Sequence, residues 1–167
     1  SPRGIAGAIR INLSEGRGAL SGHGGSTITQ QTAKLLCLGK PYKAKDWKSE
    51  SQYEANCRQS SLWRKIKEAL FAIALELEFT KDEIMTLYLN RAFLGAGSRG
   101  FQAASQRYFN KSASNLNPAE AAMLAGLLVA PSRYAPTNNL SKSQNRASII
   151  LDLMEQQGLL SSDLTKY

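Results

Sequence analysis

Helical periodicity over residues 60–80 constrains the fold of this chain more than any other feature of its sequence. In this segment, SSLWRKIKEALFAIALELEFT, apolar residues recur three and four positions apart, which is the spacing of one face of an α-helix. A step of about 100° per residue places these side chains on one face: Leu62, Ile66, Ala69, Leu70, Ile73 and Leu77. Phe71 and Leu75 lie on the opposite side, so we expect the helix to be covered on two sides.

The rest of the chain also has helical character, and no strand-like alternation is sustained. A helix is expected over SPRGIAGAIRINL (1–13), and another from Ser26 or Thr27 to about Leu38, after Gly24-Gly25. Later helices are expected over KDEIMTLYLN (81–90), FQAASQRYF (101–109), NPAEAAMLAGLLVA (117–130) and SKSQNRASIILDLMEQQG (141–158), the last with Gly158 as its C-cap. The predicted fold class is all-α, in one domain over residues 1–167 without repeats.

Residues 39–60, GKPYKAKDWKSESQYEANCRQS, form a polar, basic and turn-rich segment that interrupts this pattern. We expect a long inserted loop, in which Tyr42, Trp47 and Tyr53 are interleaved with lysines. Cys37 lies just before this segment and Cys57 near its end, and the residues alone leave open a disulfide or two unrelated free thiols. A disulfide here would stabilise the fold by roughly 3 kcal/mol. No cysteine–histidine cluster indicates a metal site.

The charge of the chain favours an anionic partner. A net charge of +8 and a pI near 9.7 suit nucleic acid, phosphate groups or an anionic membrane surface. The longest apolar run, AAMLAGLLVA (121–130), is far shorter than the ~20 residues that a membrane-spanning helix needs. The chain begins at Ser1 without methionine, so we expect it to be processed or excised from a longer protein.

Two segments combine into a candidate ligand site. In GHGGSTITQQTAK (22–34), glycines precede a helix that is rich in threonine and glutamine. In RKIKE (64–68), three cations come immediately before Glu68. Helix N-termini and clustered cations bind anions, and neutral polar side chains suit hydroxyl-rich ligands, so a phosphorylated carbohydrate fits both segments. The competing interpretation is a solvated helix with salt bridges between residues three apart.

The segments GGSTITQQTAK (24–34), RKIKE (64–68) and IMTLYLN (84–90), in this order, resemble the motif series of the family 51 glycosyltransferases. These are the peptidoglycan polymerase domains of bifunctional penicillin-binding proteins and of their monofunctional relatives. Similarity continues through residues 98–136 and through NRASIILDLM (145–154), so it covers nearly the whole chain. The resemblance implies a lysozyme-like helical fold with a small hydrophobic lobe that dips into the membrane.

The resemblance also implies a reaction. The family joins lipid-linked disaccharide-peptide units, lipid II, into glycan strands: the 4-hydroxyl of the acceptor sugar attacks the anomeric carbon of the donor with inversion, and undecaprenyl pyrophosphate leaves. The implied partners are lipid II, the growing glycan strand and the membrane surface, at the outer face of the bacterial cytoplasmic membrane. Nucleic acid is not an implied partner. No cofactor is implied, and a requirement for a divalent cation stays open.

Motif positions carry the family's residue roles onto this chain. Glu68 matches the second of the family's two functional glutamates, the one near the donor pyrophosphate, and Asn90 closes the fourth motif, where we expect a structural role. The residues implied in substrate binding are Arg64, Lys65, Lys67, Lys34, Gln30, Gln31, Ser26 and Thr27. The outer face of the membrane is oxidising, which implies that Cys37 and Cys57 are bridged.

The chain departs from the family pattern in several places. The first motif, which resembles E-D-x-x-F-x-x-H-x-G and holds the glutamate proposed as general base, is absent. His23 is not its histidine, because it lies too far downstream and lacks the acidic pair. We therefore expect an N-terminally incomplete domain that does not polymerise alone. Thr86 replaces a usual glutamate, the segment 39–60 is longer than usual, and S-x-x-K of a transpeptidase occurs nowhere.

Two other function classes stay open. A basic nucleic-acid- or membrane-binding module would use the net charge and the lysine–aromatic segment, although no recognised nucleic-acid motif is present. A lysozyme-like hydrolase would need two carboxylates facing one bond, whereas the nearest sequence neighbours of Glu68 are cations. Binding that depends on lipid II would favour the polymerase, and salt-sensitive DNA binding would favour the binding module.

Overall fold

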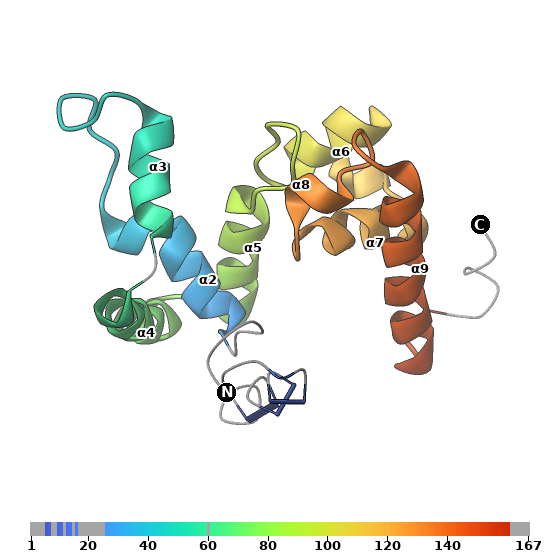
Figure 1. Ribbon diagram of the computed structural model, residues 1–167, viewed down its shortest axis with the longest axis horizontal. Helices are drawn as coiled ribbons and strands as arrows, with labels where there is room; N and C mark the ends of the chain where they lie inside the picture. Colours follow the sequence, from blue (N-terminus) through green and yellow to red (C-terminus); the bar gives the residue numbers. More distant parts are fainter. Residues whose placement is uncertain are drawn as a thin grey trace. The chain divides into compact units, whose positions relative to one another are not determined.

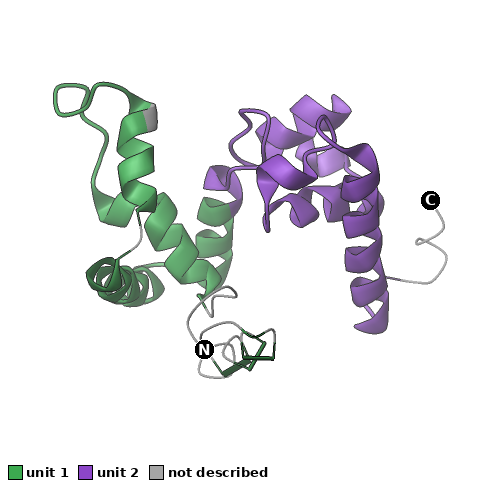
Figure 2. Cartoon of the chain, viewed as in Figure 1, with its two compact units in different colours: residues 1–88 green, residues 89–167 purple. Residues whose placement is uncertain are grey.

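The computed structural model of the protein describes residues 6–7, 10–11, 13–14, 16, 26–59 and 61–160. Within these residues the structure is helical and contains no strand, only one isolated bridge, which confirms the all-α fold class. Two compact units are present, residues 1–88 and 89–167 (Figure 2). The single domain stays a prediction. The expected helix over residues 1–13 falls largely outside the described residues, and His23 and Gly24-Gly25 fall wholly outside them.

The first unit is built from α2 (Ile28–Leu35), η1 (Cys37–Gly39), α3 (Glu50–Arg58), α4 (Leu62–Glu78) and most of α5 (Lys81–Arg91) (Figure 1). Helix α2 packs against α4, and Ala33, Leu75 and Ile84 bring α2, α4 and α5 into one core. The helices predicted after Gly24-Gly25, over residues 60–80 and over residues 81–90 are therefore confirmed as elements. Among the described helices, none has the length and apolar character needed to cross a membrane.

Helix α2 ends three residues earlier than predicted because the backbone reverses its handedness. Cys37, Leu38 and Gly39 have φ values of +53°, +55° and +75°. These values lie in the left-handed region, which L-residues other than glycine rarely adopt, so the right-handed helix cannot continue through them. Leu38 packs on the core of the first unit from this turn.

The prediction of a loop over residues 39–60 is wrong for its second half, which forms α3. Ser49 caps this helix by accepting a hydrogen bond of 3.2 Å from the backbone of Gln52, and Glu50 and Arg58 lie at the ends that the helix dipole favours. Tyr53 on α3 packs against the rings of Tyr42 and Trp47, with centroids 5.5 and 5.6 Å away. Capping and ring packing together stabilise a helix that lacks an apolar face.

Helix α4 buries a different face from the one that its periodicity predicts. The residues it buries are Glu68, Ala72 and Leu75, on the side that faces α2. The predicted apolar face is exposed instead, with Leu62 83% and Leu77 82% exposed. We call this surface the apolar stripe, which consists of Leu62, Ile66, Leu70, Ile73 and Leu77. Periodicity shows that a helix has an apolar face, but it does not show what covers that face.

The second unit contains α6 (Phe101–Phe109), η2 (Ala113–Asn115), α7 (Pro118–Leu127), α8 (Pro131–Tyr134) and α9 (Leu140–Gln156). Asn117 and Glu120 form a capping box at the start of α7, with Pro118 in the first turn. Helix α7 packs closely on α9, because Gly126 lies where a Cβ atom would be 2.9 Å from Arg146 Cγ. The helices predicted in this half of the chain are confirmed.

Candidate active site

Lys65 links the buried carboxylate of α4 to the residue that precedes the cap of α2. Ser61 caps α4 one turn before the cations, which fixes their direction along the helix. The Nζ of Lys65 donates to Glu68 Oε2 at 2.9 Å and to Ser26 Oγ at 3.0 Å. The two segments that the sequence singled out therefore meet at Lys65.

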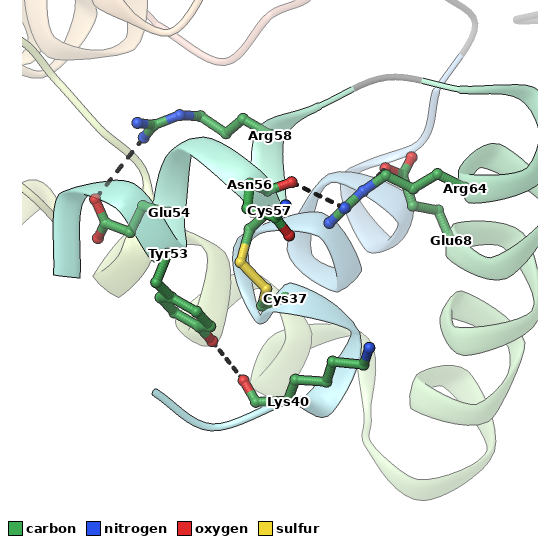
Figure 3. The surroundings of a disulfide bond; sticks show 9 residues. All are labelled: Cys37, Lys40, Tyr53, Glu54, Asn56, Cys57, Arg58, Arg64 and Glu68. Carbon is green, nitrogen blue, oxygen red and sulfur yellow. Dashed lines mark hydrogen bonds and ion pairs between the residues drawn. A yellow bond between two sulfur atoms is a disulfide. The ribbon is translucent and has the colours of Figure 1, made fainter. Parts of the chain in front are cut away.

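Arg64 forms an ion pair with the second oxygen of the same carboxylate (Figure 3). Its Nε lies 3.6 Å from Glu68 Oε1, and its NH1 donates to the carbonyl of Asn56 at 3.0 Å. The side chains of Arg64 and Glu68 are 17% and 3% exposed. A buried carboxylate requires such partners, because an unpaired charge away from water is strongly unfavourable. The salt bridge between residues three apart is therefore present, from Lys65 to Glu68, but the carboxylate of Glu68 is buried and not solvated.

Glu76 lies on the same flank of α4 as Lys65 but has a different environment. Its Oε1 accepts from Lys81 Nζ at 2.5 Å and from Thr29 Oγ1 at 2.7 Å. These hydrogen bonds, that of Lys81 first, hold the pKa of the Glu76 carboxyl below its ordinary value. Glu76 thus ties α4 to α2 and to the start of α5, while its own side chain remains 44% exposed.

Several polar residues of α2 have structural partners. The hydroxyl of Thr27 accepts from the backbone of Gln30 at 3.2 Å, and Gln30 Oε1 accepts from the backbone of Thr27 at 3.0 Å. This capping box occupies the oxygens of both side chains at the N-terminus of the helix. Gln31 Oε1 accepts from the hydroxyl of Tyr88 at 3.3 Å. Lys34 is half-buried in the last turn.

Lys67 lies on the other side of α4 from Lys65, because residues two apart are separated by about 160° around a helix axis. Its Nζ is 5.7 Å from the ring centroid of Trp63, within the range of a cation–π interaction. Both residues line a cavity of about 620 Å³ beside α4. The charged residues of its lining are Lys40, Arg64 and Lys67, and no carboxylate lines it. The cations of the RKIKE motif are thus divided between two surfaces.

The remaining predicted residues lie at two separate places. Cys37 and Cys57 are buried and form a disulfide, with Cα atoms 5.1 Å apart. Asn90 belongs to the last turn of α5 and to the second unit. Its carbonyl lies close to Gly100, where a Cβ atom would be 2.7 Å from Asn90 O. The structural role of Asn90 stays a prediction.

Sequence reasoning missed two features of the site. It did not find the Asn56 carbonyl that binds Arg64, because a backbone acceptor has no signature in the residue type. It also did not find the partners of Glu76, because Thr29 and Lys81 lie on other helices. The excess of threonine in residues 27–32 was the available signal, and of these threonines Thr29 is the one whose hydroxyl donates to α4.

The chain matches one protein family and is similar to several penicillin-binding proteins. The model of the family described as Transglycosylase matches residues 1–155. Penicillin-binding protein 1A of Aquifex aeolicus is 39% identical over 162 residues, which cover 97% of this chain and 19% of that protein. Penicillin-binding protein 2D of Bacillus subtilis is 42% identical over 138 residues, 83% of this chain and 17% of that protein. The chain therefore spans only a minor part of these relatives.

Among solved structures, the crystal structure of penicillin-binding protein 1A from Haemophilus influenzae is 41% identical to this chain. The match covers 51% of this chain and 13% of the other, with a TM-score of 0.49.

Proposed function

The chain belongs to the transglycosylase family, and on that premise we propose that it polymerises lipid II into the glycan strands of peptidoglycan. The observation that carries this proposal is the buried Glu68, whose two oxygens face Lys65 and Arg64, with Lys65 reaching Ser26. The names of the relatives, penicillin-binding proteins, support a role in cell-wall synthesis.

In the proposed reaction, the 4-hydroxyl oxygen of the acceptor sugar forms a bond to the anomeric carbon of the donor with inversion. The bond from that carbon to the pyrophosphate oxygen breaks, and undecaprenyl pyrophosphate leaves with the electron pair. The ammonium of Lys65 stabilises the negative charge that develops on the leaving group. Its hydrogen bonds to Glu68 and Ser26 hold it in place before the reaction begins.

The proposed role of Glu68 is to position the cations rather than to touch the sugar. Both of its oxygens have cationic partners, and its side chain is only 3% exposed. We assign removal of the acceptor proton to the glutamate of the family's first motif, as the resemblance implies. Glu76 is a poor substitute, because it lies about 12 Å from Glu68 along the helix axis and is bound to Lys81 and Thr29.

The apolar stripe of α4 supports the proposed location at a membrane. Contiguous exposed apolar surface is unusual on a monomer and marks an interaction site. A lipid-linked substrate lies in the membrane, and the apolar stripe is on the helix that carries Lys65 and Glu68. We therefore propose that these residues lie at the level of the lipid head groups. The proposed location is the outer face of the cytoplasmic membrane, where the disulfide is stable.

The experiment is glycan-strand synthesis from lipid II by Glu68→Gln, in a protein that includes the first motif, together with a thermal melt. We expect polymerisation to fall at least about a hundredfold, because the neutral amide no longer holds the cations, while the protein still melts cooperatively. Asp152→Asn in α9 is the matched control and should keep wild-type turnover. Wild-type polymerisation by Glu68→Gln would reject the assignment.

A further inference from the structure

The bridged segment, residues 37–58, is closed on itself by two contacts (Figure 3). Its ends are joined by the Cys37–Cys57 disulfide. Within it, the hydroxyl of Tyr53 on α3 donates to the carbonyl of Lys40, just after η1. Both sulfur-bearing residues are buried, so the C-terminal end of α3 is held against η1, which in turn contacts α4.

The residue immediately before Cys57 presents its backbone to the active site. The carbonyl of Asn56 accepts the hydrogen bond from Arg64 NH1 at 3.0 Å. Arg64 Nε is buried and has no hydrogen-bond partner among the described residues, since its 3.6 Å separation from Glu68 is an ion pair beyond hydrogen-bond length. The Asn56 contact therefore fixes the direction of the planar guanidinium, and the ion pair with Glu68 follows from that direction.

We propose that the bridged segment is a positioning element for the active site: the disulfide holds the Asn56 carbonyl against Arg64, and Arg64 is thereby held beside Glu68. The Cys37–Cys57 bond and the Asn56 carbonyl act through Arg64 and do not touch substrate. The effect on turnover rests on the proposed function, whereas the effect on Arg64 itself does not.

The hydrogen bond to the Asn56 carbonyl keeps the Arg64 guanidinium in place. If α3 moves away, the guanidinium loses its acceptor in a site where an unsatisfied donor is unfavourable, and it turns toward water. Glu68 then keeps Lys65 as its cationic partner, and Lys65 is drawn further toward Glu68 and away from Ser26. Loss of the disulfide and loss of the guanidinium should therefore have the same consequence, and they should not add.

The first experiment is a double-mutant cycle on lipid II turnover, in the protein as its gene encodes it. Cys37→Ala/Cys57→Ala and Arg64→Lys should each lower kcat about tenfold with little change in KM, and the combined variant should be no slower than Arg64→Lys alone. Arg58→Lys is the control on the same helix, because Arg58 forms an ion pair with Glu54 at 4.0 Å and its own side chain is 53% exposed. Its effect should multiply with that of the cysteine variant. Multiplying effects for Arg64→Lys would overturn the proposal.

The second experiment follows the Nε–H of Arg64 by NMR and does not need activity. Its signal is assigned by its disappearance in Arg64→Lys. Exchange of this proton with water should be slow in the wild type and faster in the cysteine variant by about tenfold or more, because a buried, fixed group becomes mobile. Exchange at the wild-type rate would overturn the proposal. A wild type that shows the expected exchange but no turnover would reject the proposed function and leave the positioning role supported.

If the cysteine variant loses its cooperative melt, Tyr53→Phe takes its place. This variant keeps the disulfide and removes only the hydroxyl that contacts the Lys40 carbonyl. Faster exchange of Arg64 Nε–H in Tyr53→Phe supports the proposal, and exchange equal to that of the wild type contradicts it.

Discussion

Helices α4 and α7 are both rich in apolar residues, yet they bury opposite kinds of surface. In α7, Leu124 and Leu127 are fully buried in the core of the second unit. In α4, the apolar stripe faces outward, while the carboxylate of Glu68 is turned inward between two cations. Helix α7 uses its apolar residues for stability. The apolar stripe of α4 is exposed and therefore contributes little to stability, so it is available for a partner outside the chain.

The comparison predicts that equal truncations have unequal effects on folding. Leu124→Ala should lower the free energy of unfolding by about 2–5 kcal/mol, because it leaves a cavity in a packed core. Leu77→Ala, at a side chain that is 82% exposed, should change it by less than about 0.5 kcal/mol. Urea denaturation of both variants measures this. A large loss in Leu77→Ala would show that the stripe is covered within the protein.

The second prediction concerns the charged flank of α4. Lys65→Ala should raise the barrier for glycosyl transfer by about 2–4 kcal/mol, because it removes the cation proposed to stabilise the leaving pyrophosphate. The measurement is kcat for lipid II consumption by a protein that includes the first motif. Lys142→Ala in α9 is the charge-matched control. Full turnover by Lys65→Ala would show that another group stabilises the charge on the leaving pyrophosphate.

The third prediction tests the apolar stripe against a membrane. Leu62→Ser/Leu77→Ser should weaken binding to vesicles of phosphatidylglycerol and phosphatidylethanolamine by about 1–3 kcal/mol, because two exposed leucines no longer insert. Val129→Ser/Leu153→Ser removes two exposed apolar residues from the second unit and should bind like the wild type. Cosedimentation with vesicles separates the two pairs. An equal loss of vesicle binding in both double variants would show that the apolar stripe of α4 is not a specific membrane-binding surface.

The smallest effect is expected from Glu76. Because the pKa of its carboxyl is lowered in the folded protein, its contribution to stability is present above the ordinary value of 4.5 and is lost as the pH falls through the folded pKa. Glu76→Gln should therefore melt slightly below the wild type at pH 7, and the difference should disappear as the pH falls through the lowered pKa of the folded protein. Thermal melts from pH 7 to pH 3 measure this. A difference that does not change with pH would exclude the ion pair with Lys81 as its cause.

Local signals in the sequence were sufficient for most helices. Capping residues such as Thr27 and Asn117, and proline in a first turn, act within a few residues of the element they start, so they can be identified without knowing the fold. The overlooked α3 also had such a signal in Ser49 and Gln52, but its polar composition favoured the interpretation as a loop.

The site was less accessible to such reasoning. Motif positions pointed to Lys65 and Glu68, and the structure places them within 2.9 Å of each other. The burial of Glu68 depends on α2 packing over α4, which is a contact between segments far apart in the sequence. The same dependence explains why the periodicity of α4 indicated the wrong buried face. Lys67 was grouped with Lys65 by motif position, although helix geometry alone puts residues two apart on different sides of the helix.

The left-handed turn after α2 has a consequence for how the first unit folds. An L-residue in this conformation costs roughly 1–2 kcal/mol, so Cys37 and Leu38 seldom adopt it in the unfolded chain. The turn becomes favourable only when Leu38 packs on the core and Cys37 meets Cys57. We therefore expect the turn to form after α2 has docked on α4. A substitution that weakens this turn should accelerate unfolding more than it slows folding.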